Sequence, residues 1–260
     1  MSHETLQLDH KGEVATITLN RPEKRNALSS LMIAEMMAAF DAIESSHARV
    51  AIVTGTGKAF CAGMDLDALR TLAGQSLEQN VEDSRSFANL LYRIYSFPKP
   101  IIAAVNGAAI AGGCGIATLA DFTLSVPEAQ FGYTEVKIGF IPAVVSVFLR
   151  RQIGEKRARD LLISGRIISA GDALQLGLVS ELVPAITLAA RAQEFAGILL
   201  AASPTSIART KRLLLRYDDP ALKAELEIAV RENADIRSTA DFREGLSSFL
   251  EKRAPKWTGR

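Results

Sequence analysis

A single glutamate in the middle of the chain could act as a general base. Glu135 lies within residues 131–142, where most of its neighbours are apolar. Burial among apolar side chains disfavours an ionised carboxylate and raises its pKa, which suits a group that takes up and releases a proton near neutral pH. A solvated glutamate paired with Lys137 explains this segment at least as well, so Glu135 is at this point only a candidate.

Two segments of small residues could bind a developing negative charge. Residues 57–66 follow a predicted strand, and residues 106–114 follow another and open a predicted helix. Backbone N–H groups at such a helix start point outward with the positive end of the dipole, so they can hold an oxyanion. A strand-to-helix turn and tight packing through glycine are the plainer interpretations. Gly57-Lys58 lacks the Gly-x-x-x-x-Gly-Lys-Ser/Thr spacing of a phosphate loop, so nucleotide hydrolysis has little support.

The order of predicted elements indicates an α/β core followed by a helical tail. Strand and helix patterns alternate in the first half, which is typical of α/β folds. The predicted strands are residues 13–19, 50–54, 101–105 and 122–126, and the predicted helices are residues 29–45 and 81–95. Four helices without intervening strands are predicted afterwards, at residues 188–200, 204–215, 222–237 and 241–252. We expect this tail to pack on its own core or on a neighbouring subunit.

Composition argues against several classes of function. The 260 residues carry 30 basic and 29 acidic side chains, without the basic excess of a nucleic-acid-binding protein. No run of about 18 apolar residues predicts a membrane span, and the start of the chain does not read as a secretory signal, so we expect a cytoplasmic protein without membrane or nucleic-acid partners. The two cysteines and three histidines show no metal-ligand spacing, so no metal site is predicted.

Taken in order along the chain, these segments resemble the crotonase (enoyl-CoA hydratase/isomerase) superfamily over nearly the whole length. The segments that match its patterns are residues 19–22, 26–28, 59–66, 106–107, 111–114, 120–121, 131–142, 169–170, 173–179, 244–245 and 249–252. The resemblance implies an α/β fold, a crotonase-type spiral of repeated ββα units with a C-terminal helical trimerisation region. Residues 1–195 would form the spiral core with the acyl-CoA site. Residues 196–260 would provide oligomerisation and a contact with coenzyme A.

The resemblance also implies roles for individual residues. The backbone N–H groups of Ala62 and Gly112 would form an oxyanion hole for the thioester enolate, and Glu135 would be the catalytic glutamate. The residues expected to bind substrate or coenzyme A are Lys24, Arg25, Ala27, Leu28, Ala62, Met64, Asp65, Leu66, Gly112, Phe249 and Lys252. No cofactor is expected, since coenzyme A is part of the substrate. The expected assembly is a homo-trimer or a hexamer made of two trimers.

Two departures from the family pattern leave the reaction open. Typical hydratases carry a second glutamate a few residues into the helix that starts at Gly112, and that position is Gly115 here. The glycine-rich stretch that usually follows Pro142 is replaced by the more apolar residues 143–148. Hydration of a 2-enoyl-CoA fits the overall resemblance, whereas Δ3,Δ2-enoyl-CoA isomerisation needs only one glutamate. A non-catalytic acyl-CoA binder is the third alternative.

Overall fold

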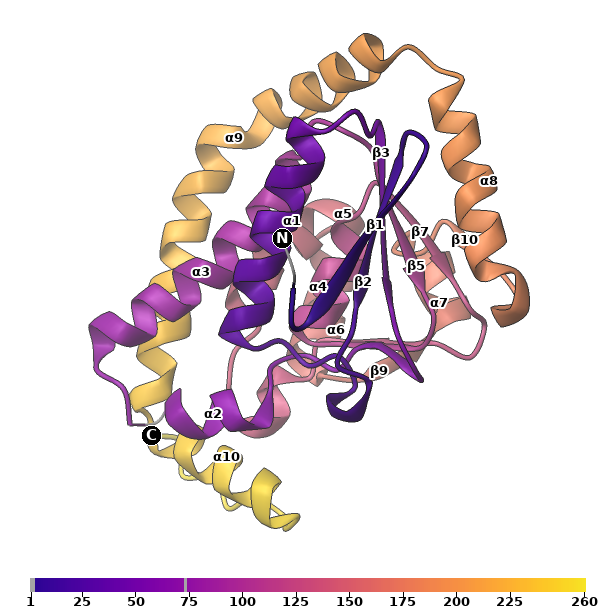
Figure 1. Cartoon of the computed structure of the whole chain (residues 1–260). Helices are drawn as coiled ribbons and strands as arrows, with labels where there is room; N and C mark the ends of the chain where they lie inside the picture. The colour runs from indigo at the N-terminus through magenta and orange to yellow at the C-terminus, as the bar shows by residue number, and fades with distance from the viewer. Residues whose placement is uncertain (1–2, 73) are drawn as a thin grey trace.

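A six-stranded sheet forms the centre of the fold (Figure 1), in the order β1-β2-β3-β5-β7-β10. The computed structural model describes residues 3–72 and 74–260, apart from the side chain of Leu66. The strands of this sheet are β1 Leu6–Lys11, β2 Val14–Leu19, β3 Val50–Gly55, β5 Ile101–Val105, β7 Phe122–Ser125 and β10 Glu181–Leu182. Only β1 pairs antiparallel. Every residue of β5 is buried, as expected for a parallel strand covered on both faces.

A second, smaller sheet has the order β4-β6-β8-β9. Its strands are β4 Ala59–Cys61, β6 Ala108–Ile110, β8 Gln130–Gly132 and β9 Ile167–Ser169. The pairs β3–β4, β5–β6 and β7–β8 each send one strand to the large sheet and the next to the small sheet, and a helix follows each pair. This repeat is the ββα spiral that the family resemblance implied, so the expected fold class is confirmed. Short strands in the regions of residues 59–61 and 108–110 were not predicted.

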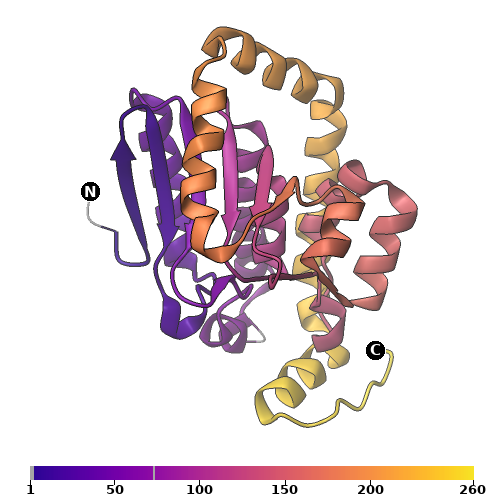
Figure 2. The same cartoon turned by 90° about the vertical axis from the view of Figure 1, so that its right-hand side faces the viewer.

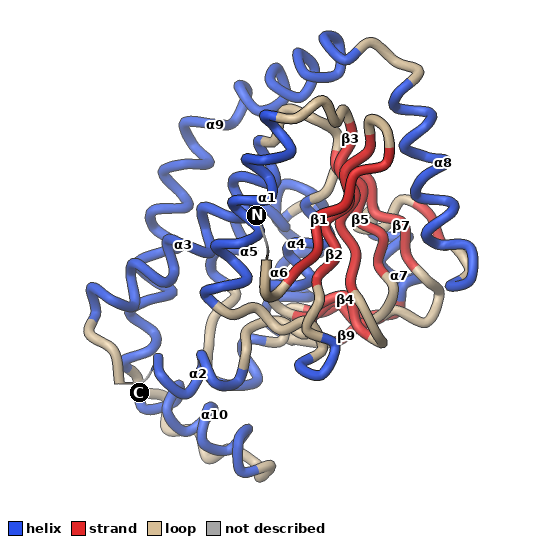
Figure 3. The backbone as a smooth tube through the Cα atoms, viewed as in Figure 1, coloured by secondary structure: helices blue, strands red, loops and turns tan. Residues whose placement is uncertain are grey.

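Helices enclose the sheets, as Figure 3 shows with helices in blue and strands in red. They are α1 Ser30–Ser45, α2 Leu66–Leu72, α3 Leu77–Ser96, α4 Gly112–Leu119, α5 Ala143–Ile153, α6 Glu155–Ser164 and α7 Ala170–Leu176. The predicted cap of α1 is confirmed, because the Ser29 hydroxyl accepts a hydrogen bond from the Met32 N–H at 3.2 Å. The apolar stripe of α1 is buried, and its Phe40 packs edge-on against Phe97 with ring centroids 5.1 Å apart.

The C-terminal part of the chain is helical, with α8 Leu188–Leu200, α9 Pro204–Asp235 and α10 Ala240–Glu251. In Figure 2, α8 covers the sheet and α9 passes over the core before descending beside it. Phe195 of α8 packs on Phe122 of β7 with ring centroids 4.8 Å apart. The predicted boundary between residues 195 and 196 therefore falls inside a helix that packs on the sheet.

One predicted break in this region is wrong. Residues 204–215 and 222–237 were expected to form two helices, but α9 continues through Pro220. A proline inside a helix removes one backbone hydrogen bond and bends the helix. The helix is attached to its neighbours near the proline, where the Tyr92 hydroxyl of α3 donates to Asp219 at 2.6 Å and Arg150 of α5 pairs with Glu225 at 2.6 Å.

No single helix within the described residues is long and apolar enough to cross a membrane. The segments 185–200 and 204–238 meet that test of length and composition only as a pair, across a bend of 97°.

Candidate active site

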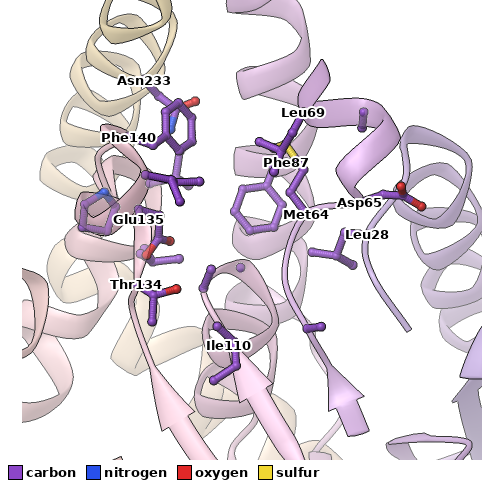
Figure 4. A pocket seen from close by; sticks show the side chains of 18 of the residues that line it. Leu28, Met64, Asp65, Leu69, Phe87, Ile110, Thr134, Glu135, Phe140 and Asn233 are labelled. Atoms are coloured by element: carbon purple, nitrogen blue, oxygen red, sulfur yellow. The ribbon is translucent and has the colours of Figure 1, made fainter. Parts of the chain in front are cut away.

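A pocket of about 820 Å³ lies where the two small-residue segments, the turn of Glu135 and the C-terminal helices meet. Its walls come from the loop before α1, the β4–α2 loop, the start of α4, the segment leading into α5, and residues of α3, α9 and α10. In Figure 4 one side of the pocket carries Thr134, Glu135, Phe140 and Asn233, and the other carries Leu28, Met64, Asp65, Leu69 and Phe87.

Glu135 is a buried carboxylate without a partner on one oxygen. It opens the short 3-10 helix η2, Glu135–Ile138, and only 8% of its surface is exposed. Its Oε2 is enclosed and accepts no hydrogen bond from the described residues. Burial raises the pKa of this carboxyl to about 7, against a smaller lowering by its own backbone N–H. The structure therefore favours the buried base over a solvated glutamate, and no ion pair joins it to Lys137 among the described residues.

Two glycines hold the turn of Glu135 against the last helix. Gly139 ends η2 with a φ of 68°, and a Cβ there would lie 2.3 Å from the carbonyl oxygen of Asp241. A Cβ on Gly245 of α10 would lie 2.3 Å from the carbonyl of Ile138. The backbones of η2 and α10 thus meet with no room for a side chain between them. We call this contact the glycine seam.

The N-terminus of α4 presents an unpaired amide to the pocket. Gly112 is the first residue of α4, and the preceding Ala111, at φ 50°, has no side-chain cap to offer. No carbonyl of the described residues accepts the Gly112 N–H. A Cβ on Gly112 would lie 2.8 Å from Cζ of Phe87, so only glycine fits here without displacing that ring. This position agrees with the predicted role of Gly112, which stays a prediction.

The N–H of Ala62 points elsewhere, which corrects one predicted donor. Ala62 lines the pocket, but its N–H donates to the carbonyl of Arg25 at 3.0 Å. A donor that is already paired cannot stabilise an oxyanion without breaking that bond. In this structure the N–H of Ala62 therefore helps to build the loop.

Met64 has the free amide that Ala62 lacks. It forms a parallel bridge with Leu28, in which the Leu28 N–H donates to Gly63 at 2.7 Å and the Asp65 N–H donates to Leu28 at 2.9 Å. These two bonds direct the N–H of Met64 itself away from Leu28. No acceptor for it exists among the described residues. Gly63, at φ 89°, turns the chain between the paired amide of Ala62 and the free amide of Met64.

The two amide segments are fixed to each other by close backbone approach. A Cβ on Gly63 would lie 3.1 Å from Cβ of Ala111, and a Cβ on Gly113 would lie 2.4 Å from the carbonyl oxygen of Cys61. Asn26, fully buried at φ 54°, adds side-chain bonds to the carbonyls of Thr56 and Ala59, both at 2.9 Å. This explains why asparagine stands in the matched segment 26–28, since it tolerates the left-handed conformation.

An ion pair anchors the loop of Met64 on its outer side. Arg21 contacts Asp65 at 2.7 Å, and the Asp65 side chain is 4% exposed. Asp65 also accepts from the Asp67 N–H at 2.9 Å, while Arg21 donates to the Ala27 carbonyl at 2.8 Å. Asp65 was predicted to contact coenzyme A, and here it lines the pocket while holding the loop.

Most of the residues predicted to bind substrate or coenzyme A lie together. The pocket-lining members of that set are Lys24, Arg25, Leu28, Ala62, Met64, Asp65, Gly112 and Phe249. Ala27 is buried and is not part of the lining, and Lys252 ends α10 without lining the pocket of its own chain. The side chain of Leu66 lies outside the described residues. No group of three or more metal-binding side chains occurs within the described part of the chain.

Comparison with known proteins agrees with this arrangement. Residues 9–260 match the sequence model of the family described as "Enoyl-CoA hydratase/isomerase". The chain belongs to that family. Among its relatives, a Thermus thermophilus protein named "Putative enoyl-CoA hydratase" is 43% identical, over 95% of this chain and 98% of that protein. The 2,3-dehydroadipyl-CoA hydratase of Escherichia coli K12 is 33% identical, over 98% and 99%.

Solved structures of enoyl-CoA hydratase/isomerase relatives share the fold. An enoyl-CoA hydratase/isomerase from Xanthobacter autotrophicus Py2 superposes with a TM-score of 0.89 at 31% identity, covering 97% of this chain and 98% of that one. The carnitinyl-CoA hydratase from Mycobacterium avium gives 0.87 at 32% identity, covering 100% of both. Members of this family act on acyl-CoA thioesters.

The two departures from the enoyl-CoA hydratase/isomerase pattern meet in space. A Cβ on Gly115 would lie 2.8 Å from Cγ1 of Val145 and 3.5 Å from Cδ1 of Leu91. Val145 belongs to the apolar stretch after Pro142 and lines the pocket. The absence of a side chain at position 115 is therefore matched by the bulk of Val145, which the sequence alone did not indicate.

Sequence reasoning missed several lining residues. Phe87 was predicted only as part of an apolar helix stripe, and Phe140, Asn233 and Arg237 were given no role, although all four line the pocket. The sequence held one indication for Arg237: it stands at the end of an apolar helix face, and a buried arginine needs hydrogen-bonding or charged partners. Its partners come from α3, more than a hundred residues earlier, which a periodic pattern cannot show.

Proposed function

We propose that this protein hydrates a 2-enoyl-CoA thioester, with Glu135 as its single acid–base group and the N–H groups of Met64 and Gly112 as its oxyanion hole. The observation that carries the proposal is one pocket that holds a buried carboxylate with a free oxygen and two amides without acceptors. The names of the relatives, hydratases at 33–43% identity, support the same reaction.

The proposed reaction uses one carboxyl group twice. Ionised Glu135 accepts a proton from water as the water oxygen bonds to C3 of the enoyl group. The C2–C3 π electrons move toward the thioester, and the resulting enolate oxygen is held by the two amides, an arrangement that commonly contributes several kcal/mol. Neutral Glu135 then returns the proton to C2. A pKa of about 7 suits both roles, because neither protonation state is then costly near neutral pH.

Lys24, Arg25, Leu28 and Phe249 would contact the coenzyme A part of the substrate, which needs no further cofactor. We also propose the trimeric or hexameric assembly and the cytoplasmic location that the family resemblance suggested. Lys252 would then reach the coenzyme A of a neighbouring subunit, since it does not line the pocket of its own chain.

Isomerisation of a 3-enoyl-CoA is the second candidate, and one observation favours it. Val145 covers Gly115, so the pocket has no second carboxylate at the position that typical hydratases use to hold water. Glu135 alone could take a proton from C2 and return it at C4, and the dienolate formed between the two steps would be held by the same two amides.

The test is to incubate the protein separately with a 2-enoyl-CoA and a 3-enoyl-CoA of equal length and to follow the products by chromatography and mass spectrometry. Gain of one water by the 2-enoyl substrate is expected. Conversion of the 3-enoyl substrate at unchanged mass, without hydration of either compound, would replace hydration by isomerisation. If neither compound reacts while both bind, the chain is an acyl-CoA binder and the proposal is wrong.

A further inference from the structure

A buried arginine closes one end of the substrate pocket. Arg237 lines the pocket and is 2% exposed, and it is among the largest fully buried side chains of the described residues. Its guanidinium pairs with Asp83 at 2.8 Å and donates to Asn80 at 3.0 Å. The proposed hydration makes no use of this group. With Ser84 and Asn233 these side chains form what we call the Arg237 cluster.

The Arg237 cluster leaves one amide donor without a partner. Asn233 is 8% exposed and lines the pocket. Its Oδ1 accepts from the Ser84 hydroxyl at 2.7 Å and from Arg237 Nη2 at 2.9 Å, so the orientation of the amide is fixed by two donors. Its Nδ2 then carries two hydrogens for which no acceptor exists among the described residues. This donor lies in the wall of the pocket, where a ligand can accept a hydrogen bond from it.

Figure 4 places Asn233 on the same side of the pocket as Glu135, with Phe140 between them. Phe140 lies 5.5 Å below the guanidinium of Arg237. An acyl chain that starts at Glu135 therefore passes apolar surface before it meets the cluster. The acyl chain would thus meet apolar side chains first and polar side chains at its far end. A pocket for a plain alkyl chain would be apolar along its whole length.

We propose that the Arg237 cluster is a subsite for an oxygen acceptor at the far end of the acyl chain, bound by the amide Nδ2 of Asn233. This deepens the proposed function, on which it rests for the identity of the thioester. The shared ligand chemistry is a hydroxyl, carbonyl or carboxylate oxygen. Asp83 already balances the charge of Arg237, so a neutral oxygen costs less here than a carboxylate.

A purely structural role explains the arginine but not the free amide. Asp83, Ser84 and Asn80 belong to α3, and Asn233 to α9, so the cluster joins two helices that pack along each other. That task uses the oxygen of the amide, which accepts two hydrogen bonds, and it leaves the nitrogen without one. The unpaired side of Asn233 faces a pocket that must hold a substrate.

The test measures binding of saturated acyl-CoA thioesters, which can be neither hydrated nor isomerised. Butyryl, hexanoyl and octanoyl chains, each ending in a methyl, a methyl ketone or a carboxylate group, are compared by calorimetry. A ketone oxygen can only accept a hydrogen bond, whereas a hydroxyl could donate one to the carboxylate of Asn233→Asp. At the fitting length, the ketone-ended chain is expected to bind the wild type about three- to tenfold more tightly than it binds Asn233→Asp, because one hydrogen bond is lost. The methyl-ended chain should bind both proteins equally.

Asn80→Asp is the matched control. It makes the same change beside the same guanidinium, since Asn80 accepts from Arg237 Nη1, but Asn80 does not line the pocket. It should leave the preference for oxygen-ended chains unchanged. Equal effects of the two substitutions, or methyl-ended chains that bind best to the wild type at every length, would overturn the subsite. Because the probes do not react, the binding result can be interpreted even if the proposed hydration is wrong.

Discussion

The two halves of the candidate site are built in opposite ways. On the amide side, Gly63, Gly113 and Asn26 fix backbone against backbone, and the N–H groups of Met64 and Gly112 have no acceptor among the described residues. On the base side, Glu135 has an enclosed oxygen with no partner at all. Backbone donors gain from being immobile, whereas a base must stay free to accept a proton. The rigid part of the candidate site is therefore the part that we propose to stabilise charge, and the proposed acid–base group is the one without a partner on its enclosed oxygen.

Removing the base should have the largest effect. Glu135→Gln keeps the size of the side chain but cannot take up a proton, so turnover should fall about a hundredfold or more. Affinity for a saturated acyl-CoA should stay unchanged, because the amide side remains intact. Steady-state kinetics measures the turnover, and calorimetry measures the affinity. Unchanged turnover would contradict the role of Glu135.

Disturbing the amide side should have the next largest effect. Gly112→Ala places a Cβ 2.8 Å from Cζ of Phe87, which must shift the amide or the ring. We expect kcat to fall about ten- to a hundredfold, since oxyanion donors act only when well placed. Gly197→Ala in α8 is the control, because nothing lies within 4 Å of the added atom. Adding Phe87→Leu should recover part of the loss if the clash is the cause.

Only the base side should respond to pH. With a pKa of about 7, Glu135 must lose its proton to act, so kcat/KM should rise about tenfold per pH unit below 7 and level off above it. The amides do not titrate in this range. A flat profile from pH 5 to pH 8 would contradict the assignment.

The same raised pKa predicts a stability effect of definite sign. The carboxyl pKa is near 4.5 in the unfolded chain and about 7 in the folded one, so the folded protein binds the proton more tightly. Stability is therefore lost as pH rises from about 4.5 to 7, by about 3 kcal/mol. Glu135→Gln lacks this loss, so its melting temperature should exceed that of the wild type at pH 8 by more than it does at pH 5. Equal differences at both pH values would count against the burial of an ionised Glu135.

The wall of Gly115 and Val145 offers the smallest effect, on stability. Gly115→Ala overpacks the contact at 2.8 Å, with an expected cost of about 1–3 kcal/mol. Val145→Ala leaves a small cavity there. The double variant should lose less than the sum of the two, because each change relieves the other. Scanning calorimetry measures this, and strict additivity would show that the two residues are independent.

Much of the fold follows from local patterns. The strand at residues 101–105 and the helix at residues 188–200 were predicted with the bounds that the structure has. The predictions failed where a neighbour decides the outcome. Pro220 reads as a helix break, but packing on α3 and α5 carries α9 through it. The three-residue strands of the small sheet are too short to show a period of two.

The site was predictable in its segments but not in its atoms. The segment around Ala62 was correctly placed at the pocket, yet the free amide belongs to Met64, two residues later. The difference depends on the positive φ of Gly63, which reverses the direction of successive N–H groups. Glycine at that position signals an unusual turn, but no residue type tells which neighbouring amide is left unpaired.

The glycine seam connects the C-terminal helix α10 directly to the turn that carries Glu135. Gly139 and Gly245 leave no slack between the turn of Glu135 and α10, and Phe249 of the same helix lines the pocket. The terminal residues fold back on α10, where Asp241 accepts from Thr258 at 2.7 Å. A substrate that contacts Phe249 therefore contacts the helix that packs against the turn of Glu135, the proposed base. Shortened thioesters without the nucleotide should accordingly lose turnover as well as affinity, because binding at the distant end is converted into order at the reacting end.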